Sequence, residues 1–173
     1  MNKPFSHLSL FKIHVGKLMK CISLMSFLLG LSCGLFLTEN VTAQTKHFNL
    51  DQGLAIYGYD PVAYFLDSKA KEGSSEYSFK YQDVEYRFIN EKHKTLFSNN
   101  PGKYLPQYGG WCAYAMGDSG EKVEIDPETF KIVQGKLYLF YNFYFNNTLK
   151  KWNKEETLLK KQADKNWQEL IDN

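Results

Sequence analysis

The sequence predicts an α+β domain in which small antiparallel β-hairpins pack with short helices and a C-terminal amphipathic helix. Two runs in the middle of the chain alternate polar with aromatic residues, which is the period of a strand with one buried face. A later run repeats its apolar residues at the spacing of a helix face. With 173 residues the chain is long enough for one domain but not comfortably for two.

Two β-hairpins follow from alternation and from the residues between the strands. Residues 76–81 and 84–88 alternate polar with aromatic or apolar side chains and are separated by two residues. Residues 130–133 and 136–141 flank Gln134-Gly135, and glycine suits the second position of a tight hairpin turn. We therefore expect both pairs of runs to form antiparallel strands.

Short helices are predicted from capping residues. Asp60-Pro61 marks a turn, after which residues 62–65 begin a short strand or one turn of helix. Asn90 is suited to cap a helix over residues 91–99, and the following Asn-Pro-Gly ends it. Asn146 or Asn147 is the expected cap of a further short helix that carries Leu149 and Trp152.

The C-terminal helix is predicted over residues 155–171. Its apolar stripe consists of Leu159, Ala163, Trp167 and Leu170. We expect this stripe to be core packing, with Trp167 buried against the sheet.

Residues 1–43 have the order of an export signal. A positive segment carries Lys12, Lys17 and Lys20; residues 21–37 are almost uninterruptedly apolar; and Val41-Thr42-Ala43 supplies the small residues of a cleavage site. We expect cleavage after Ala43. The remaining domain, residues 44–173, would then be periplasmic or secreted and would keep no stable membrane span.

Three alternatives to this processing remain open. Met19 is suitable as the true start, since a signal that begins there has ordinary proportions. An uncleaved membrane anchor is disfavoured because the apolar run is short for a bilayer span. A lipid anchor on Cys33 is the minor alternative, because Gly30 stands three positions before it and the apolar run continues beyond it.

Cleavage after Ala43 removes Cys21 and Cys33 and leaves Cys112 as a lone cysteine. A lone cysteine cannot form an intramolecular disulfide, so in an oxidising compartment it is buried, metal-bound or paired with another chain. Burial as a small apolar side chain is the more common case. A ligand or a reactive thiol is the alternative.

Charge and motifs exclude some classes of function. The net charge is +2 and residues 1–43 hold four lysines and one acid, so the remainder is close to neutral and has no basic run for nucleic acid. The sequence contains no nucleophile elbow, zinc-protease, phosphate-loop or dinucleotide motif. An enzyme is therefore poorly supported.

The order of several short motifs resembles the YHS domain. The resemblance rests on Asp60-Pro61-Val62, Tyr86-Arg87-Phe88 and Asn100-Pro101, within a core of about residues 58–106. The longer runs 58–65, 107–115 and 135–139 resemble the stand-alone exported branch of this family and extend the likeness over nearly all of residues 44–173. The resemblance implies a small exported binding module rather than a particular activity.

The resemblance also implies where a metal would bind and where this chain departs from that pattern. In metal-associated YHS modules, cysteines suited to soft metals stand at three positions, and here those positions hold Ala63, Ile89 and His93. Three thiolates therefore cannot be rebuilt. We interpret His93, which lies between Lys92 and Lys94, as a solvated surface residue.

The remaining candidate ligand site is centred on Cys112, which follows two glycines. If the resemblance holds, other polar and aromatic side chains lie near it: Tyr59, Asp60, Tyr108, Trp111 and Tyr114. Asp60 also has a plainer role as the acceptor of a turn before Pro61. Tyrosines of this kind are more often core residues, with their hydroxyls bonded to a partner, than ligands.

Three hypotheses follow for function. The first is an exported YHS-type module that binds a transition metal such as copper, or a small ligand, at a partly accessible Cys112. The second is a non-catalytic accessory protein that contacts an envelope protein, with Cys112 buried. The third and weakest is a thiol-dependent enzyme, because no base or cation stands near Cys112 in the sequence.

Overall fold

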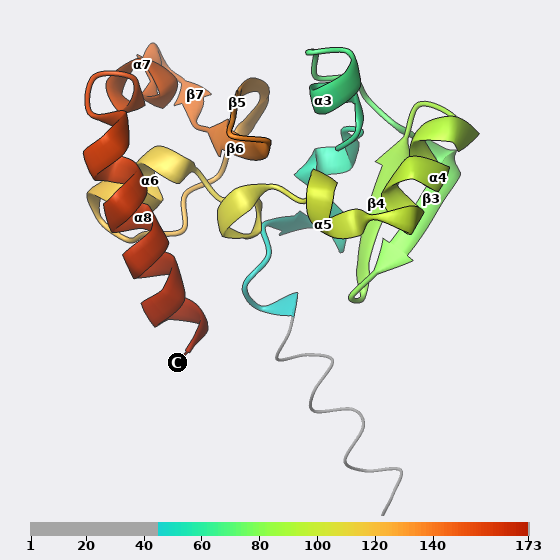
Figure 1. Cartoon of the computed structure of the whole chain (residues 1–173), viewed down its shortest axis with the longest axis horizontal. Helices are drawn as coiled ribbons and strands as arrows, with labels where there is room; N and C mark the ends of the chain where they lie inside the picture. The colour runs from blue at the N-terminus through green and yellow to red at the C-terminus, as the bar shows by residue number, and fades with distance from the viewer. Residues whose placement is uncertain (1–44, 173) are drawn as a thin grey trace, which may run out of the picture. The chain divides into compact units, whose positions relative to one another are not determined.

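The computed structural model describes residues 45–172 and shows mixed helices and small sheets, which confirms the α+β class (Figure 1). Thr45–Asn173 forms one compact unit. It contains two hydrophobic clusters of its own, so it has the core that independent folding requires. The expected export signal, the cleavage site after Ala43, the alternative start at Met19 and the lipid anchor on Cys33 lie outside the described residues.

The first half of the unit is built on a four-stranded sheet in the order β1-β2-β4-β3. Its strands are β1 (Leu50–Asp51), β2 (Leu54–Ala55), β3 (Ser74–Tyr81) and β4 (Val84–Phe88). The predicted first hairpin is confirmed, with Tyr81 opposite Val84 and a register shift between Ser74 and Ser78. β2 and β4 pair in parallel, whereas the other neighbours are antiparallel.

Short helices cover this sheet and enclose its aromatic core. They are η1 (Ile56–Gly58), α3 (Ala63–Leu66), α4 (Glu91–Asn99) and α5 (Pro101–Tyr104). The predicted cap of α4 is confirmed, because Oδ1 of Asn90 accepts the backbone N–H of His93 at 2.9 Å. Phe97 on α4 is fully buried, and rings from the sheet and from α5 surround it. These rings belong to Phe79, Tyr81, Tyr86, Phe88 and Tyr104.

The second half contains two hairpins and the longest helix. Its elements are η2 (Gln107–Gly110), α6 (Ala113–Asp118), β5 (Asp126–Val133), β6 (Lys136–Phe140), β7 (Asn142–Phe143), β8 (Asn146–Asn147), α7 (Thr148–Trp152) and α8 (Glu156–Ile171). The predicted hairpin around Gln134-Gly135 is confirmed as β5–β6. Asn147 caps α7 through the backbone N–H of Lys150. The sequence did not predict β7–β8.

The core of this half lies between α6, α8 and β6. Gly117 allows α6 to approach α8 closely, since a Cβ at this position would stand 2.5 Å from the backbone oxygen of Leu159. Leu159 and Ala163 are buried as predicted, but Trp167 is only half-buried, so the expectation that it is a buried core residue is wrong. Trp152 on α7 is the fully buried tryptophan. Within residues 45–172, no helix is long and apolar enough to cross a membrane.

Candidate functional site

Cys112 lies at the N-terminal end of α6 and is fully buried. Its Sγ accepts the backbone N–H of Tyr141 at 3.4 Å and lies 3.4 Å from Oγ1 of Thr148. The Thr148 hydroxyl donates to the backbone oxygen of Tyr141 at 2.9 Å. The thiol proton is therefore free to point at Oγ1, so that the Cys112 sulfur, the Thr148 hydroxyl and the backbone of Tyr141 form a closed ring of hydrogen bonds.

This ring fixes the base of the hairpin β7–β8. Tyr141 directly precedes β7, and Thr148 directly follows β8. The backbone N–H of Thr148 also donates to the oxygen of Tyr141 at 3.0 Å. Cys112 thus holds the two ends of a hairpin that stands 29 or more positions away in the sequence. The expectation of a partly accessible sulfur is not met, because the thiol is used inside the fold.

A hollow of about 220 Å³ lies next to this ring. Its wall contains Cys112 and Tyr114, together with charged side chains that include Asp118, Glu121 and Lys151. Nζ of Lys151 lies 5.6 Å from the centroid of the Tyr114 ring. Desolvation, and then the nearby Asp118 carboxylate, raise the pKa of Tyr114. A lysine and an aspartate of this hollow therefore both lie near Tyr114.

Asp60 is fully buried and makes hydrogen bonds through both carboxylate oxygens. Oδ1 accepts the backbone N–H groups of Val62 at 2.7 Å and Ala63 at 3.3 Å, which is the turn predicted before Pro61. Oδ2 accepts the N–H of Ile89 at 2.9 Å and lies 2.7 Å from Nδ1 of His93. The carboxylate therefore joins the end of β4 and helix α4 to the Asp-Pro turn.

The expectation that His93 is a solvated surface residue is wrong. Its side chain is only 6% exposed, because it stands one turn before Phe97 on the buried face of α4. Ala63, Ile89 and His93, which stand where the YHS resemblance would place cysteines, all contact Asp60. Ala63 and Ile89 contact the carboxylate through their backbone N–H groups. Of these three residues, His93 alone contacts it through a side chain.

Tyr59, Tyr108 and Trp111 do not converge with Cys112. The hydroxyl of Tyr108 donates to Oδ1 of Asp164 at 2.9 Å, and burial followed by this hydrogen bond raises the Tyr108 pKa. Nε1 of Trp111 donates to the backbone oxygen of His47 at 2.8 Å. Tyr59 forms an isolated bridge with Glu72, and desolvation followed by the Glu72 charge raises its pKa.

Of the residues predicted to surround Cys112, the structure places only Tyr114 in the same hollow. The polar groups of the others are bonded to different partners. Among residues 45–172, no group of three or more His, Cys, Asp or Glu side chains is arranged to hold a metal ion.

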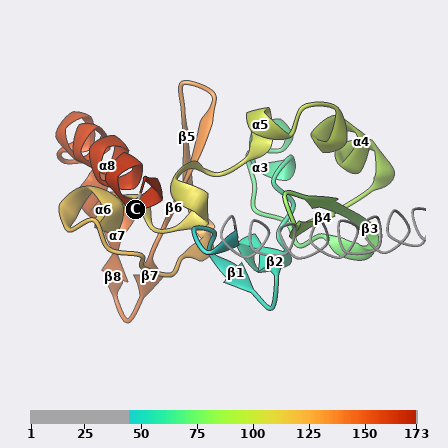
Figure 2. The ribbon, with the colours of Figure 1, turned by 90° about the horizontal axis from the view of Figure 1, so that it is seen from below.

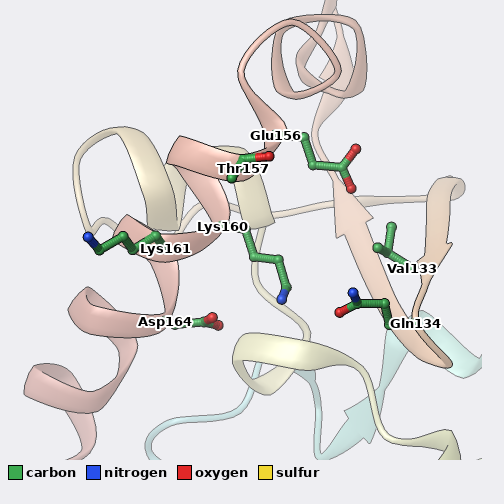
Figure 3. A pocket seen from close by; sticks show the side chains of 7 residues that line it. All are labelled: Val133, Gln134, Glu156, Thr157, Lys160, Lys161 and Asp164. Carbon is green, nitrogen blue, oxygen red and sulfur yellow. The ribbon is translucent and has the colours of Figure 1, made fainter.

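A larger hollow of about 360 Å³ lies between α8 and the turn of the β5–β6 hairpin (Figure 3). The Lys160 side chain extends from α8 across it toward Gln134, whereas Lys161 points away (Figure 3). Its two carboxylates are already engaged: Glu156 pairs with Lys131 at 2.5 Å, and Asp164 accepts the Tyr108 hydroxyl. No residue predicted for a site lines this hollow.

The turn of β7–β8 exposes three consecutive aromatic side chains, Phe143, Tyr144 and Phe145, which we name the aromatic tip. Tyr144 is 93% exposed, Phe145 is fully exposed and Phe143 is 43% exposed. The hairpin projects beyond α7 and is seen from the side in Figure 2. Sequence analysis missed it because Tyr-Phe is not a turn signal, although a run of aromatics between asparagines is unusual for a loop.

The backbone of the aromatic tip is strained. Tyr144 and Phe145 have φ values of 51° and 64°, and positive φ is unfavourable for bulky residues. Three other two-residue turns also have positive φ at both positions, and these hold Gln52-Gly53, Gln82-Asp83 and Gln134-Gly135. Each of those pairs ends in glycine or aspartate, which tolerate this conformation. Among these four turns, the aromatic tip differs in holding a phenylalanine at the second position, where the others hold glycine or aspartate.

Comparison with known proteins adds no assignment. No protein-family model, curated protein or solved structure matches the chain.

Proposed function

We propose that the chain is an exported, non-catalytic accessory module of the YHS type that acts by docking its aromatic tip against another component of the cell envelope. The observation that carries this proposal is the near-complete exposure of Tyr144 and Phe145 at positive φ. Each position costs of order 1 kcal/mol of strain, and each aromatic leaves apolar surface in water. An exposed apolar feature with an intrinsic cost is a mark of a contact site.

The base of the hairpin supports the same proposal because it is anchored at several points. The amide of Asn142 donates to Oγ1 of Thr129 at 3.0 Å and to Oδ2 of Asp126 at 3.3 Å. The ring of Tyr141 packs edge-on against Phe143 with centroids 5.1 Å apart. Together with the Cys112 ring of hydrogen bonds, these contacts hold the tip in one direction, as a preorganised contact element requires.

Photo-crosslinking in cells tests this proposal. A photoreactive phenylalanine analogue is placed at Phe145 in the full chain, and a matched copy carries it at Leu158, an exposed apolar position on α8. We expect an adduct in the envelope fraction from position 145 and none from position 158. Absence of any adduct at position 145 in exported protein would show that the tip does not dock.

A metal or small ligand in the hollow beside Cys112 is a second candidate function. It is favoured by one observation, that Cys112, Tyr114 and Lys151 line a hollow that opens next to the thiol. A ligand there would have to break the ring formed by Cys112, Tyr141 and Thr148. Titration of residues 44–173 with Cu(I), Cu(II) and Zn(II) tests it: tight Cu(I) binding that is lost in Cys112→Ser would replace docking as the proposed function.

Export itself is tested by the mass of the protein recovered from the envelope. A chain that begins at Gln44 supports cleavage after Ala43. A mass that retains residue 1 or residue 19, or that includes a diacylglyceryl group on Cys33, would contradict it. Alkylation tests the thiol-dependent enzyme, since we expect Cys112 to react only when the domain unfolds.

A further inference from the structure

We infer that the component contacted by the aromatic tip is the lipid–water interface of a membrane, into which Phe143, Tyr144 and Phe145 insert. This inference rests on the proposed function and names the partner. The tip is a projecting turn (Figure 2). The side chains of Tyr144 and Phe145 in this turn are almost completely exposed. A projecting turn buries little surface area against a rigid protein. A fluid lipid interface can surround the turn and bury its side chains from all sides.

The side chains are of the kind that a bilayer interface accepts. Phenylalanine rings enter the apolar boundary, and a tyrosine ring places an apolar body beside the acyl chains with its hydroxyl at the headgroups. Asparagines flank the aromatics on both sides, at positions 142, 146 and 147. Because the side chains change from aromatic to polar at these asparagines, we expect only the turn itself to enter the interface, to a shallow depth.

The backbone of the tip is also suited to a medium with little water. Phe143 pairs with Asn146, and Asn142 pairs with Asn147, in the antiparallel register. The strand groups next to the turn are therefore bonded within the hairpin. Unbonded peptide groups are the main cost of placing backbone near hydrocarbon, and a closed two-residue turn keeps that number small.

Charges of both signs lie next to the hairpin. From Tyr141 to Lys154 the sequence contains Lys150, Lys151 and Lys154 and no acidic residue. All three lysines are exposed, on or beside α7 at the base of the hairpin. Asp51 and Glu124 line a hollow with Phe143, and Asp118 and Glu121 line the hollow that also holds Asn146 and Lys151. These carboxylates offset part of the attraction between the lysines and anionic headgroups. We therefore expect the aromatics to supply most of the affinity and the lysines a smaller, salt-sensitive part.

Vesicle binding by residues 44–173 tests the inference. The vesicles contain phosphatidylethanolamine with phosphatidylglycerol, and a second set contains phosphatidylcholine alone. The test variant is Tyr144→Asn with Phe145→Gly, because Asn-Gly is the pair that this turn geometry prefers and the fold is kept. The control variant is Leu66→Ser with Leu158→Ser, which removes two exposed apolar side chains outside the tip.

We expect the unmodified domain to bind the anionic vesicles, the tip variant to lose about tenfold or more in partitioning, and the control variant to stay within about twofold. Failure of the unmodified domain to bind either set, or equal binding by the tip variant, would overturn the inference. If position 145 crosslinks to a protein in cells while vesicles are not bound, the membrane inference is wrong and the docking proposal stands. If position 145 gives no adduct in cells, the docking proposal is wrong as well.

Discussion

The backbone N–H of Tyr141 donates to Sγ of Cys112 over 3.4 Å, which ties a buried helix end to the start of an exposed hairpin. The same sulfur lies 3.4 Å from the hydroxyl of Thr148 at the end of that hairpin. This relationship gives Cys112 a structural role. It also explains how an otherwise short, two-stranded hairpin keeps one direction, since isolated pairs of this length are marginal in water.

Replacing Cys112 with Ala should destabilise the domain by about 1–3 kcal/mol, because the Tyr141 N–H and the Thr148 hydroxyl lose a buried partner. Urea unfolding measures the change in free energy. Hydrogen exchange gives the specific readout: we expect faster exchange of the Tyr141 and Thr148 amides, with the Tyr86 amide in β4 changed only by the global loss of stability. Unchanged exchange at Tyr141 would contradict the role assigned to the sulfur.

Replacing Asp60 with Asn should lower the free energy of unfolding by about 2 kcal/mol or more. The amide would present a donor to the three N–H groups of Val62, Ala63 and Ile89 or to His93, so at least one buried donor loses its acceptor. The matched control is Asp83→Asn, in an exposed turn where asparagine accepts positive φ, and it should change stability by less than about 0.5 kcal/mol. Equal effects of the two substitutions would refute the network.

The two tryptophans of the C-terminal region should differ in their contribution to stability. Trp152 is fully buried against Tyr138 and Phe140, so Trp152→Ala should cost about 3–5 kcal/mol. Trp167 is half-buried, and Trp167→Ala should lower the free energy of unfolding by clearly less than Trp152→Ala does. Thermal melting of the two variants decides this; a larger loss for Trp167→Ala would contradict the packing described.

Stability should fall at alkaline pH because buried tyrosines resist ionisation. Burial raises the pKa of Tyr138 from 10.0 to about 12, and it raises the pKa values of Tyr64, Tyr86 and Tyr108 further. The unfolded chain releases these protons near pH 10 and the folded chain does not, so the stabilisation is complete below pH 10 and is lost as the pH rises through the folded values. Urea unfolding at several alkaline pH values measures the loss, which Tyr138→Phe should reduce. Constant stability above pH 10 would argue against the burial of these hydroxyls.

The strain in the aromatic tip predicts that function and stability are separable there. Tyr144→Asn with Phe145→Gly should raise the melting temperature slightly, because the new pair adopts positive φ at lower cost. The matched control is the same pair of residues placed at Gln82-Asp83, where the existing residues are already suited to the turn and little change is expected. A lower melting temperature for the tip variant would mean that the aromatics serve the fold.

Local patterns predicted the β3–β4 and β5–β6 hairpins and α4 well, because alternation, Gln134-Gly135 and the Asn90 cap act over a few residues. Long-range partners were not predictable in this way. The bonds of Cys112 depend on residues 29 and 36 positions away, and no local pattern encodes them. The predicted cluster around Cys112 also failed to form, since Asp60 and Tyr108 bond to His93 and Asp164 instead.

Two predictions about burial were wrong although the sequence contained evidence against them. His93 precedes Phe97 by one helical turn and so shares its buried face, but its lysine neighbours suggested solvent. Trp167 lies on the apolar stripe of α8, yet the stripe ends at the edge of the core and leaves this ring half-exposed. The aromatic tip had no recognisable turn residues, so its exposure became visible only in the fold.

The central claim is that the aromatic tip enters a membrane interface, and the polarity felt by a fluorophore beside it is the most direct measurement. A nitrobenzoxadiazole group is attached to Asn146→Cys, which is exposed and keeps all three aromatics, and in a control to Lys80→Cys on β3. Cys112 stays unlabelled because it is buried. On addition of phosphatidylglycerol-containing vesicles we expect a blue shift and a brighter emission from position 146 and no change from position 80. Unchanged emission at position 146 under conditions where the vesicles are in excess would contradict the claim.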